Sequence, residues 1–194
     1  MKQDIDYVFS IFEASTPVLQ IHELTDTYWK RNTANGRKGN KDSRIGPWRE
    51  GKYSVLNQAA WDERGACLYM VQEGSNIRYI GKSKTRLKDR WRLSPALDPK
   101  TMERMPGRQV FHNQCWPYIE QSATQNPNLE IEVRSIRAHK LKDVLIALGE
   151  PLSELTDFAD DEGNFVAAVE RWILGRSSNE LANWNTALTN KEDY

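Results

Sequence analysis

Two tyrosines and a dense run of cations follow one another within a short stretch of this chain. Tyr69 and Tyr79 are ten residues apart, and each lies in an apolar stretch that predicts a strand, with a turn at residues 73–76 between them. A phenol can hold or activate a water molecule, and cations bind phosphate oxygens. The pattern therefore indicates chemistry on a phosphodiester. The cations that follow are Lys82, Lys84, Arg86, Lys88, Arg90 and Arg92.

The roles of the two phenols depend on their protonation. A free tyrosine has a pKa of about 10, so Tyr69 could serve as a general base only if its neighbours favoured the phenolate. Lys82 and Arg90 are the cations expected to do so. Tyr69 could instead position the attacking water, and Tyr79 is expected to hold the phosphate or the water by a hydrogen bond. The alternative is that both rings are core aromatics of a sheet.

Three further polar residues lie downstream of the basic run. His112 begins the helical segment FHNQCWPYIEQSA, Glu170 lies in the apolar helical segment FVAAVERWILG, and Asn185 follows Glu170 by fifteen residues. Mg²⁺ takes few protein ligands, so one carboxylate can hold it when a substrate phosphate supplies another oxygen. Each residue also has an ordinary interpretation: a solvated helix glutamate, a capping or surface histidine, and a turn asparagine.

The motifs and their order resemble the GIY-YIG nuclease superfamily over roughly residues 66–185. The second tripeptide is present as Tyr79-Ile80-Gly81, and the segment LKDRW at residues 87–91 is similar to the helix that carries the catalytic arginine of the family. The first tripeptide, at residues 67–69, reads Cys-Leu-Tyr and keeps only the tyrosine. Ser94 stands where some members carry a histidine or a tyrosine.

The resemblance implies a role for each candidate residue. Arg90 matches the catalytic arginine, and its guanidinium suits two phosphate oxygens at once. Glu170 matches the metal ligand, and His112 matches a histidine that assists near the metal or the leaving group. Asn185 would orient the site through hydrogen bonds to backbone or phosphate. Because Ser94 lacks a catalytic group, either another residue fills that role or the reaction relies on Lys82 and Tyr69.

The implied function is a metal-dependent DNA endonuclease that uses Mg²⁺, with Mn²⁺ as a substitute, in a restriction, phage or mobile-element (homing) system. Two alternatives remain open: a weak or inactive DNA-binding regulator on the same scaffold, and an RNA nuclease. One such centre cuts one strand at a time. A double-strand cut would therefore require a homodimer or two successive events, and no sequence feature indicates a dimer.

Charge is unevenly distributed although the net charge is +0. Residues 30–52 hold eight Lys or Arg against two acids, residues 78–92 hold seven against one, and residues 143–170 hold eight acids without a cation. Phosphate affinity depends on local charge, so two basic regions favour DNA binding, although each could be an ordinary solvated surface. The expected DNA-binding residues are Arg37, Lys38, Lys41, Arg44, Lys84, Arg86, Lys88 and Arg92.

Composition narrows the class of protein further. No apolar run approaches the length of a membrane span, and the acid-containing segment MKQDIDYVFSIF does not read as a secretory signal. The chain has two cysteines, Cys67 and Cys115, too few for a thiolate zinc site, and Cys67 reads as a free core thiol. We therefore expect a cytoplasmic protein without membrane partners.

The expected fold is α+β: a small three-stranded antiparallel sheet flanked by helices, with strands at residues 66–72, 77–81 and 129–137. Residues 1–64 are expected to be an N-terminal extension with two short helices broken at Pro17, followed by a basic, glycine-rich arm. Residues 65–194 would form the nuclease domain, with an insertion around residues 138–165. Further helices are predicted at residues 54–64, 84–93, 110–123, 139–148 and 165–176.

Overall fold

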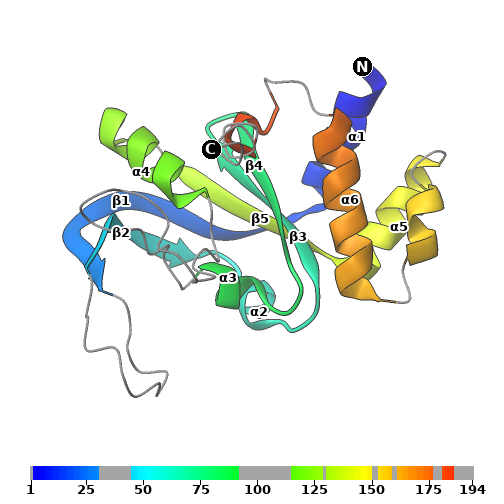
Figure 1. Cartoon of the computed structure of the whole chain (residues 1–194), viewed down its shortest axis with the longest axis horizontal. Coiled ribbons are helices and arrows are strands. Elements are labelled where there is room, and N and C mark those ends of the chain that lie inside the picture. Colours follow the sequence, from blue (N-terminus) through cyan, green and yellow to red (C-terminus); the bar gives the residue numbers. More distant parts are fainter. Residues whose placement is uncertain are drawn as a thin grey trace, which may run out of the picture.

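A computed structural model of the chain describes residues 2–30, 45–91, 115–128, 130–149, 153–158, 161–176 and 181–185. A fully antiparallel five-stranded sheet in the order β2-β1-β5-β3-β4 lies at the centre, with helices on both faces (Figure 1). The α+β class is therefore confirmed, but the sheet has five strands where the sequence predicted three. The strands are β1 Thr16–Lys30, β2 Ile45–Val55, β3 Cys67–Glu73, β4 Asn76–Ser83 and β5 Ile131–Arg137.

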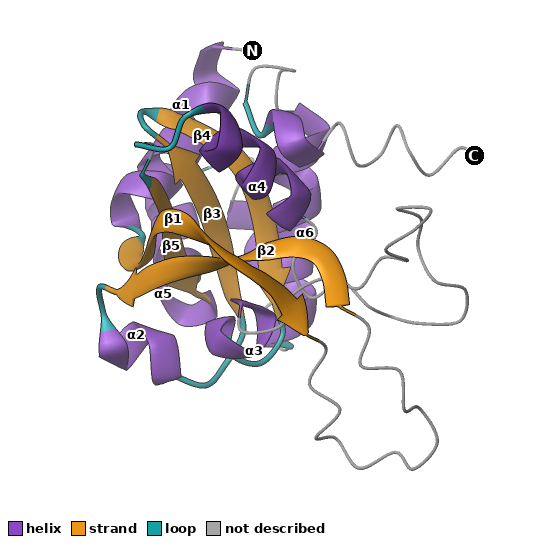
Figure 2. Cartoon of the chain, turned by 90° about the vertical axis from the view of Figure 1, so that its left-hand side faces the viewer, coloured by secondary structure: helices purple, strands orange, loops and turns teal. Residues whose placement is uncertain are grey.

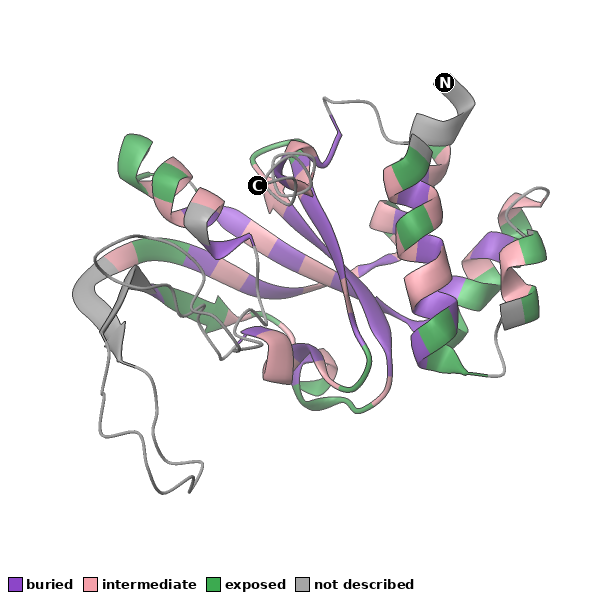
Figure 3. Cartoon of the chain, in the orientation of Figure 1, coloured by how far each residue is buried: buried purple, intermediate pink, exposed green. Residues whose placement is uncertain are grey.

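The two faces of the sheet carry separate cores, because side chains alternate along each strand. On one face, Leu68, Met70 and Ile80 pack against three helices: α1 Lys2–Ala14, α5 Ala138–Leu148 and α6 Glu162–Arg176. On the other face, Tyr69 and Tyr79 pack against α2 Gln58–Asp62, α3 Leu87–Trp91 and α4 Trp116–Gln125. Figure 3 shows β3, β4 and β5 largely buried between these two layers.

The β3–β4 hairpin forms where its alternation and turn residues predict it. A two-residue turn connects the strands, and Gly74 adopts a φ of 57°, the left-handed conformation that such turns require. β5 is the expected third strand and pairs with β3 from Glu73↔Ile131 to Cys67↔Arg137. Of the predicted helices, α5 and α6 match closely, and α4 begins at Trp116 with a proline in its first turn. The short 3₁₀ helix η1, Ser153–Phe158, contacts α5 and α6.

The N-terminal region corrects the sequence prediction. Only the first expected helix forms, because α1 ends at Ala14 and residues 16–30 are the strand β1. β1 pairs with β5 from Thr16↔Ser135 to Ile21↔Ile131, with a register shift just after Pro17. This pairing buries Val18, Leu19 and Ile21 and supplies backbone partners that a short helix would not offer. The segment before residue 64 therefore belongs to the same sheet as the hairpin.

The far ends of β1 and β2 form a two-stranded ribbon. β1 pairs with β5 only as far as Ile21, whereas its pairing with β2 continues to Lys30↔Ile45. Figures 1 and 2 show this ribbon extending beyond the other strands. The expected loop at residues 31–52 is thus a strand from Ile45 onward, and residues 31–44 lie outside the described part of the chain. Among the described helices, none is long and apolar enough to cross a membrane.

Candidate active site

The candidate residues gather around residues 79–83 of β4, which is an edge strand of the sheet. Every second residue of such a strand turns its backbone groups outward, and those groups need partners. Asn185 supplies both partners for Ile80: its Nδ2 donates to the Ile80 carbonyl at 2.7 Å, and its Oδ1 accepts from the Ile80 N–H at 2.9 Å. The Ala182 N–H donates to the Ile77 carbonyl at 3.0 Å. The turn at residues 181–185, called the C-terminal turn below, therefore lines the edge of β4.

Arg90 contacts the same edge from α3. Its Nε donates to the carbonyl oxygen of Lys82 at 3.0 Å. Because a guanidinium has five N–H donors, this bond leaves others for an anion. Leu87 and Trp91 are buried on the same short helix and fix its position against the sheet. Arg90 is therefore fixed beside β4 by packing on one side and a backbone hydrogen bond on the other.

The rings of the two tyrosines contact each other across the hairpin at a tilt. Tyr69 lies opposite Gly81 in the β3–β4 register, and the ring centroids of Tyr69 and Tyr79 are 6.0 Å apart. The rings of Trp91 and Tyr69 are nearly perpendicular, with centroids 5.8 Å apart. A Cβ atom at Gly81 would lie 2.5 Å from Cζ and 2.6 Å from Oη of Tyr69. The glycine of the YIG tripeptide is therefore required because the Tyr69 ring lies directly over it.

Burial decides the protonation of both phenols. Tyr69 is 0% exposed and Tyr79 is 5% exposed. This burial raises the pKa of both tyrosines above the usual value, and the negative charge of Glu170 acts in the same direction. Arg90 lowers the pKa of each phenol but is outweighed. The expectation that nearby cations favour a Tyr69 phenolate is therefore wrong for this structure, and both phenols are neutral at neutral pH.

The hydroxyl of Tyr69 has an unusual environment. It is buried and makes no hydrogen bond of ordinary geometry among the described residues, although it lies close enough to the Tyr79 phenol to lower the pKa of that phenol slightly against the effect of burial. A buried hydroxyl without a partner is unfavourable, so such groups often mark a place where water, an ion or a substrate binds. Since the ring crosses Gly81, the hydroxyl points toward the same edge that Asn185 and Arg90 contact.

Lys82 and Glu170 form an ion pair on the opposite face of β4. The Nζ atom of Lys82 contacts Oε2 of Glu170, and the two side chains are 30% and 12% exposed. Alternation along β4 turns Lys82 toward α6 and Gly81 toward the tyrosines. Val166, Val169 and Ile173 are buried and hold α6 against this face, which brings Glu170 to the strand.

The two faces meet at the strand edge. The charge of Glu170 acts on both phenols, as does that of Arg90, so the four side chains share one electrostatic environment. The contacts thus bring together Tyr69, Tyr79, Lys82, Arg90, Glu170 and Asn185. His112 lies outside the described residues, as do Arg37, Lys38, Lys41, Arg44 and Arg92.

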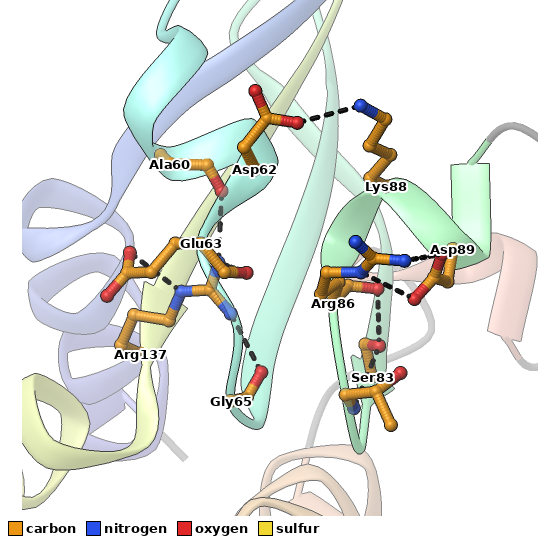
Figure 4. A network of polar contacts seen from close by, with 10 residues as sticks. Ala60, Asp62, Glu63, Gly65, Ser83, Arg86, Lys88, Asp89 and Arg137 are labelled. Atoms are coloured by element: carbon orange, nitrogen blue, oxygen red, sulfur yellow. Dashed lines mark hydrogen bonds and ion pairs between the residues drawn. The ribbon is translucent and has the colours of Figure 1, made fainter.

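Two of the expected DNA-binding cations already have acidic partners. Arg86 forms a bidentate pair with Asp89, both bonds at 2.8 Å, and Lys88 Nζ lies 2.7 Å from Asp62 Oδ1 (Figure 4). The bond from Lys88 lowers the pKa of Asp62. These pairs are partly exposed and weak, so a phosphate can replace the acid. Lys84 is exposed. Because Arg86 and Lys88 are paired with acids, the basic surface is less positive than the sequence suggests.

Arg137 is a structural residue that sequence reasoning missed. It is 7% exposed, and its guanidinium donates to the carbonyls of Ala60, Glu63 and Gly65 at 2.6–3.0 Å while pairing with the Glu63 carboxylate (Figure 4). It thereby caps α2 and fixes the entry into β3. An arginine at the end of an apolar strand was the available signal, because a buried cation needs several acceptors.

The donor set restricts which metal could bind. No cluster of three or more His, Cys, Asp or Glu residues occurs in the described part of the chain. A zinc site needs such a cluster, whereas hydrated Mg²⁺ can use a single carboxylate. The partly accessible Glu170 fits the second requirement. Cys67 and Cys115 are buried free thiols, and burial raises the pKa of Cys67 to about 11.

Comparison of the chain with protein-family models, with curated proteins and with solved structures gives no match in any of the three, so the functional argument depends on the residues and their geometry.

Proposed function

We propose that this chain is a Mg²⁺-dependent DNA endonuclease of the GIY-YIG type. The observation that carries the proposal is the convergence of two phenols, a guanidinium, a carboxylate and an asparagine on residues 79–83 of β4. These groups come from β3, β4, α3, α6 and the C-terminal turn. Their types match the needs of phosphodiester hydrolysis: anion binding, a metal-binding carboxylate and donors that orient water.

Each residue has a role that follows from its environment. Glu170 would hold Mg²⁺, and Mn²⁺ could substitute. The bound metal would neutralise phosphoryl charge and make a water molecule more acidic. Arg90 would bind phosphate oxygens with the N–H groups that Lys82 does not use. Tyr69 and Tyr79, as neutral phenols, would orient the phosphate or water by hydrogen bonds rather than act as phenolate bases. His112 is a further candidate near the leaving group.

Substrate binding is assigned to the basic regions. The β1–β2 ribbon leads to the arm that carries Arg37, Lys38, Lys41 and Arg44, and a two-stranded ribbon has dimensions that fit the major groove of DNA. Lys84 lies exposed just after β4 and would contact the phosphate backbone. Two buried free thiols favour a reducing compartment, so we place the protein in the cytoplasm, in a restriction, phage or mobile-element system.

A second candidate function, a DNA-binding regulator without cleavage, is favoured by two specific observations. The carboxylate of Glu170 is already paired with Lys82, and the phenol of Tyr69 is buried and neutral. If the pair never opens, the site cannot hold a metal.

Cleavage of supercoiled plasmid with Mg²⁺, Mn²⁺ or EDTA separates these functions. We expect metal-dependent nicking by the wild type and a loss of about 1,000-fold in Glu170→Gln, because the metal is lost, with DNA retardation retained. Glu154→Gln makes the same chemical change at an exposed position of η1 and should cut like the wild type. Retardation without cleavage would favour the regulator, and preferential cleavage of a matched RNA would favour an RNA nuclease. Wild-type cleavage by Glu170→Gln would refute the site.

A further inference from the structure

The carboxylate that the proposed nuclease needs for metal binding is already occupied in the free protein. Lys82 Nζ contacts Glu170 Oε2, and Glu170 is the less accessible partner, at 12% against 30% for Lys82. An ammonium and a divalent cation repel each other when they share one carboxylate. Metal binding at Glu170 therefore requires Lys82 to give up this contact or to share it at a loss of affinity.

The surroundings of Lys82 allow its side chain to move while its backbone stays fixed. Arg90 Nε bonds the Lys82 carbonyl, and Asn185 bonds the N–H and carbonyl of Ile80, two residues before it. The ammonium, in contrast, is attached to a flexible four-carbon stem and is partly in contact with water. Lys82 is the more accessible partner, so water or an anion can solvate its ammonium when the contact opens.

Resting on the proposed nuclease function, we propose that Lys82 couples metal binding to phosphodiester binding by exchanging partners. In the free protein it neutralises Glu170. When a divalent cation occupies Glu170, the displaced ammonium binds an oxygen of the substrate phosphate, beside the Arg90 guanidinium. After the exchange the Glu170 carboxylate is paired with the metal and the substrate phosphate with the Lys82 ammonium, so neither anion lacks a cation.

Thermodynamic linkage makes this exchange measurable. If a phosphodiester attracts Lys82 away from Glu170, it raises the affinity for the metal, and the metal raises the affinity for the phosphodiester by the same factor. A substrate phosphate that supplies an oxygen to the metal would also couple the two affinities, but that part of the coupling would not depend on Lys82. The exchange also weakens metal binding to the free protein, because Lys82 already neutralises Glu170 there.

The experiment measures Mn²⁺ affinity by electron paramagnetic resonance, with and without a short phosphorothioate DNA duplex that resists hydrolysis. In the wild type we expect the duplex to raise Mn²⁺ affinity by about tenfold, after subtraction of Mn²⁺ bound by the duplex alone. In Lys82→Met, the affinity without DNA should rise by about threefold, because the competing ammonium is gone, and the enhancement by DNA should fall to about twofold or less.

Two further variants control for charge and for folding. Lys84→Met removes the same charge from an exposed position two residues away, and it should leave the DNA-free Mn²⁺ affinity close to that of the wild type. Lys82→Gln is a second neutral variant that can still hydrogen-bond Glu170. It should show the Mn²⁺ affinities expected of Lys82→Met, and it takes the place of that variant if Lys82→Met does not fold. Both neutral variants should also gain more thermal stability from Mn²⁺ than the wild type gains, because metal replaces the lost counter-charge.

The outcomes distinguish this inference from the function on which it rests. If Glu170→Gln abolishes Mn²⁺ binding but both neutral Lys82 variants match the wild type with and without DNA, the exchange is refuted and the metal site stands. An equal gain in DNA-free affinity for Lys84→Met would also refute the exchange, since general charge would explain it. Absence of any Glu170-dependent Mn²⁺ binding would overturn both proposals.

Discussion

The two faces of β4 carry unlike halves of one site. On one face Tyr69 and Tyr79 are buried against Trp91, and burial raises the pKa of both phenols. On the other face Lys82 and Glu170 are charged and partly accessible to water. The buried half cannot carry a charge at neutral pH, so it can only orient groups by hydrogen bonds. The charged half can exchange ions with solvent, so under the proposed function metal and phosphate would bind there.

The edge of β4 connects these halves. The outward backbone groups of Ile80 and Lys82 are bonded by Asn185 and Arg90, two residues that the sequence indicates as catalytic. Both residues therefore have a structural function that needs no substrate. Variants at the edge should change stability as well as activity, whereas variants on the charged face should change mainly activity.

Gly81→Ala should break the buried half with the largest loss of stability. The new methyl group would overlap the Tyr69 ring, and we expect the free energy of unfolding to fall by about 3 kcal/mol. Urea denaturation followed by tryptophan fluorescence measures this change. Gly175→Ala is the matched control, because its Cβ would meet no atom within 4 Å and α6 should gain about 0.5–1 kcal/mol. Equal effects of the two substitutions would contradict the proposed ring contact.

Asn185→Ala tests the edge that joins the two faces. The substitution removes two hydrogen bonds and leaves the N–H and carbonyl of Ile80 without their partner. We expect a loss of about 2 kcal/mol in urea denaturation. Asn185→Asp keeps the acceptor and loses the donor, so it should lie between Asn185→Ala and the wild type. If the free energy of unfolding of Asn185→Ala equals that of the wild type within experimental error, the edge of β4 does not depend on this residue.

The hairpin was predictable from sequence because its signals are local. Alternating apolar residues and a glycine-containing turn predict β3 and β4, and the apolar spacing of residues 139–148 predicts α5. For residues 16–30 the sequence predicts a helix, because the apolar spacing of α1 continues into residues 18–24. Its strand conformation depends on pairing with β5, and that partner lies far along the chain, where no local pattern reveals it.

The site was predictable in its residue types but not in its electrostatics. The contact between Lys82 and Glu170 spans 88 positions in sequence, and no pattern in the sequence predicts it. The neutrality of Tyr69 depends on the burial of its ring beneath Trp91 and beside Tyr79, which no count of nearby cations could give. The acidic partners of Arg86 and Lys88 likewise depend on where α2 and α3 lie.

The raised pKa values of the tyrosines predict a fall in stability at alkaline pH. Above about pH 10 the unfolded chain loses phenolic protons that the folded chain keeps, so the slope of unfolding free energy against pH is negative there. Each buried phenol should contribute up to about 1 kcal/mol of loss between pH 10 and 11. Urea denaturation at these two pH values should show a smaller loss in Tyr79→Phe. An identical pH dependence in the variant would contradict the neutral, buried state.

Tyr69→Phe should have the smallest effect on stability and gives the sharpest test of the buried half. The substitution removes a hydroxyl that has no partner of ordinary geometry among the described residues, so the free energy of unfolding should change by less than about 1 kcal/mol. If the hydroxyl orients water or phosphate, plasmid cleavage should fall by about 100-fold. Tyr118→Phe, which removes another buried hydroxyl without a partner in the described part of the chain, is the matched control and should leave cleavage unchanged. Full cleavage by Tyr69→Phe would mean that this phenol is only a core aromatic, and the chemistry would then rest entirely on the charged face of β4.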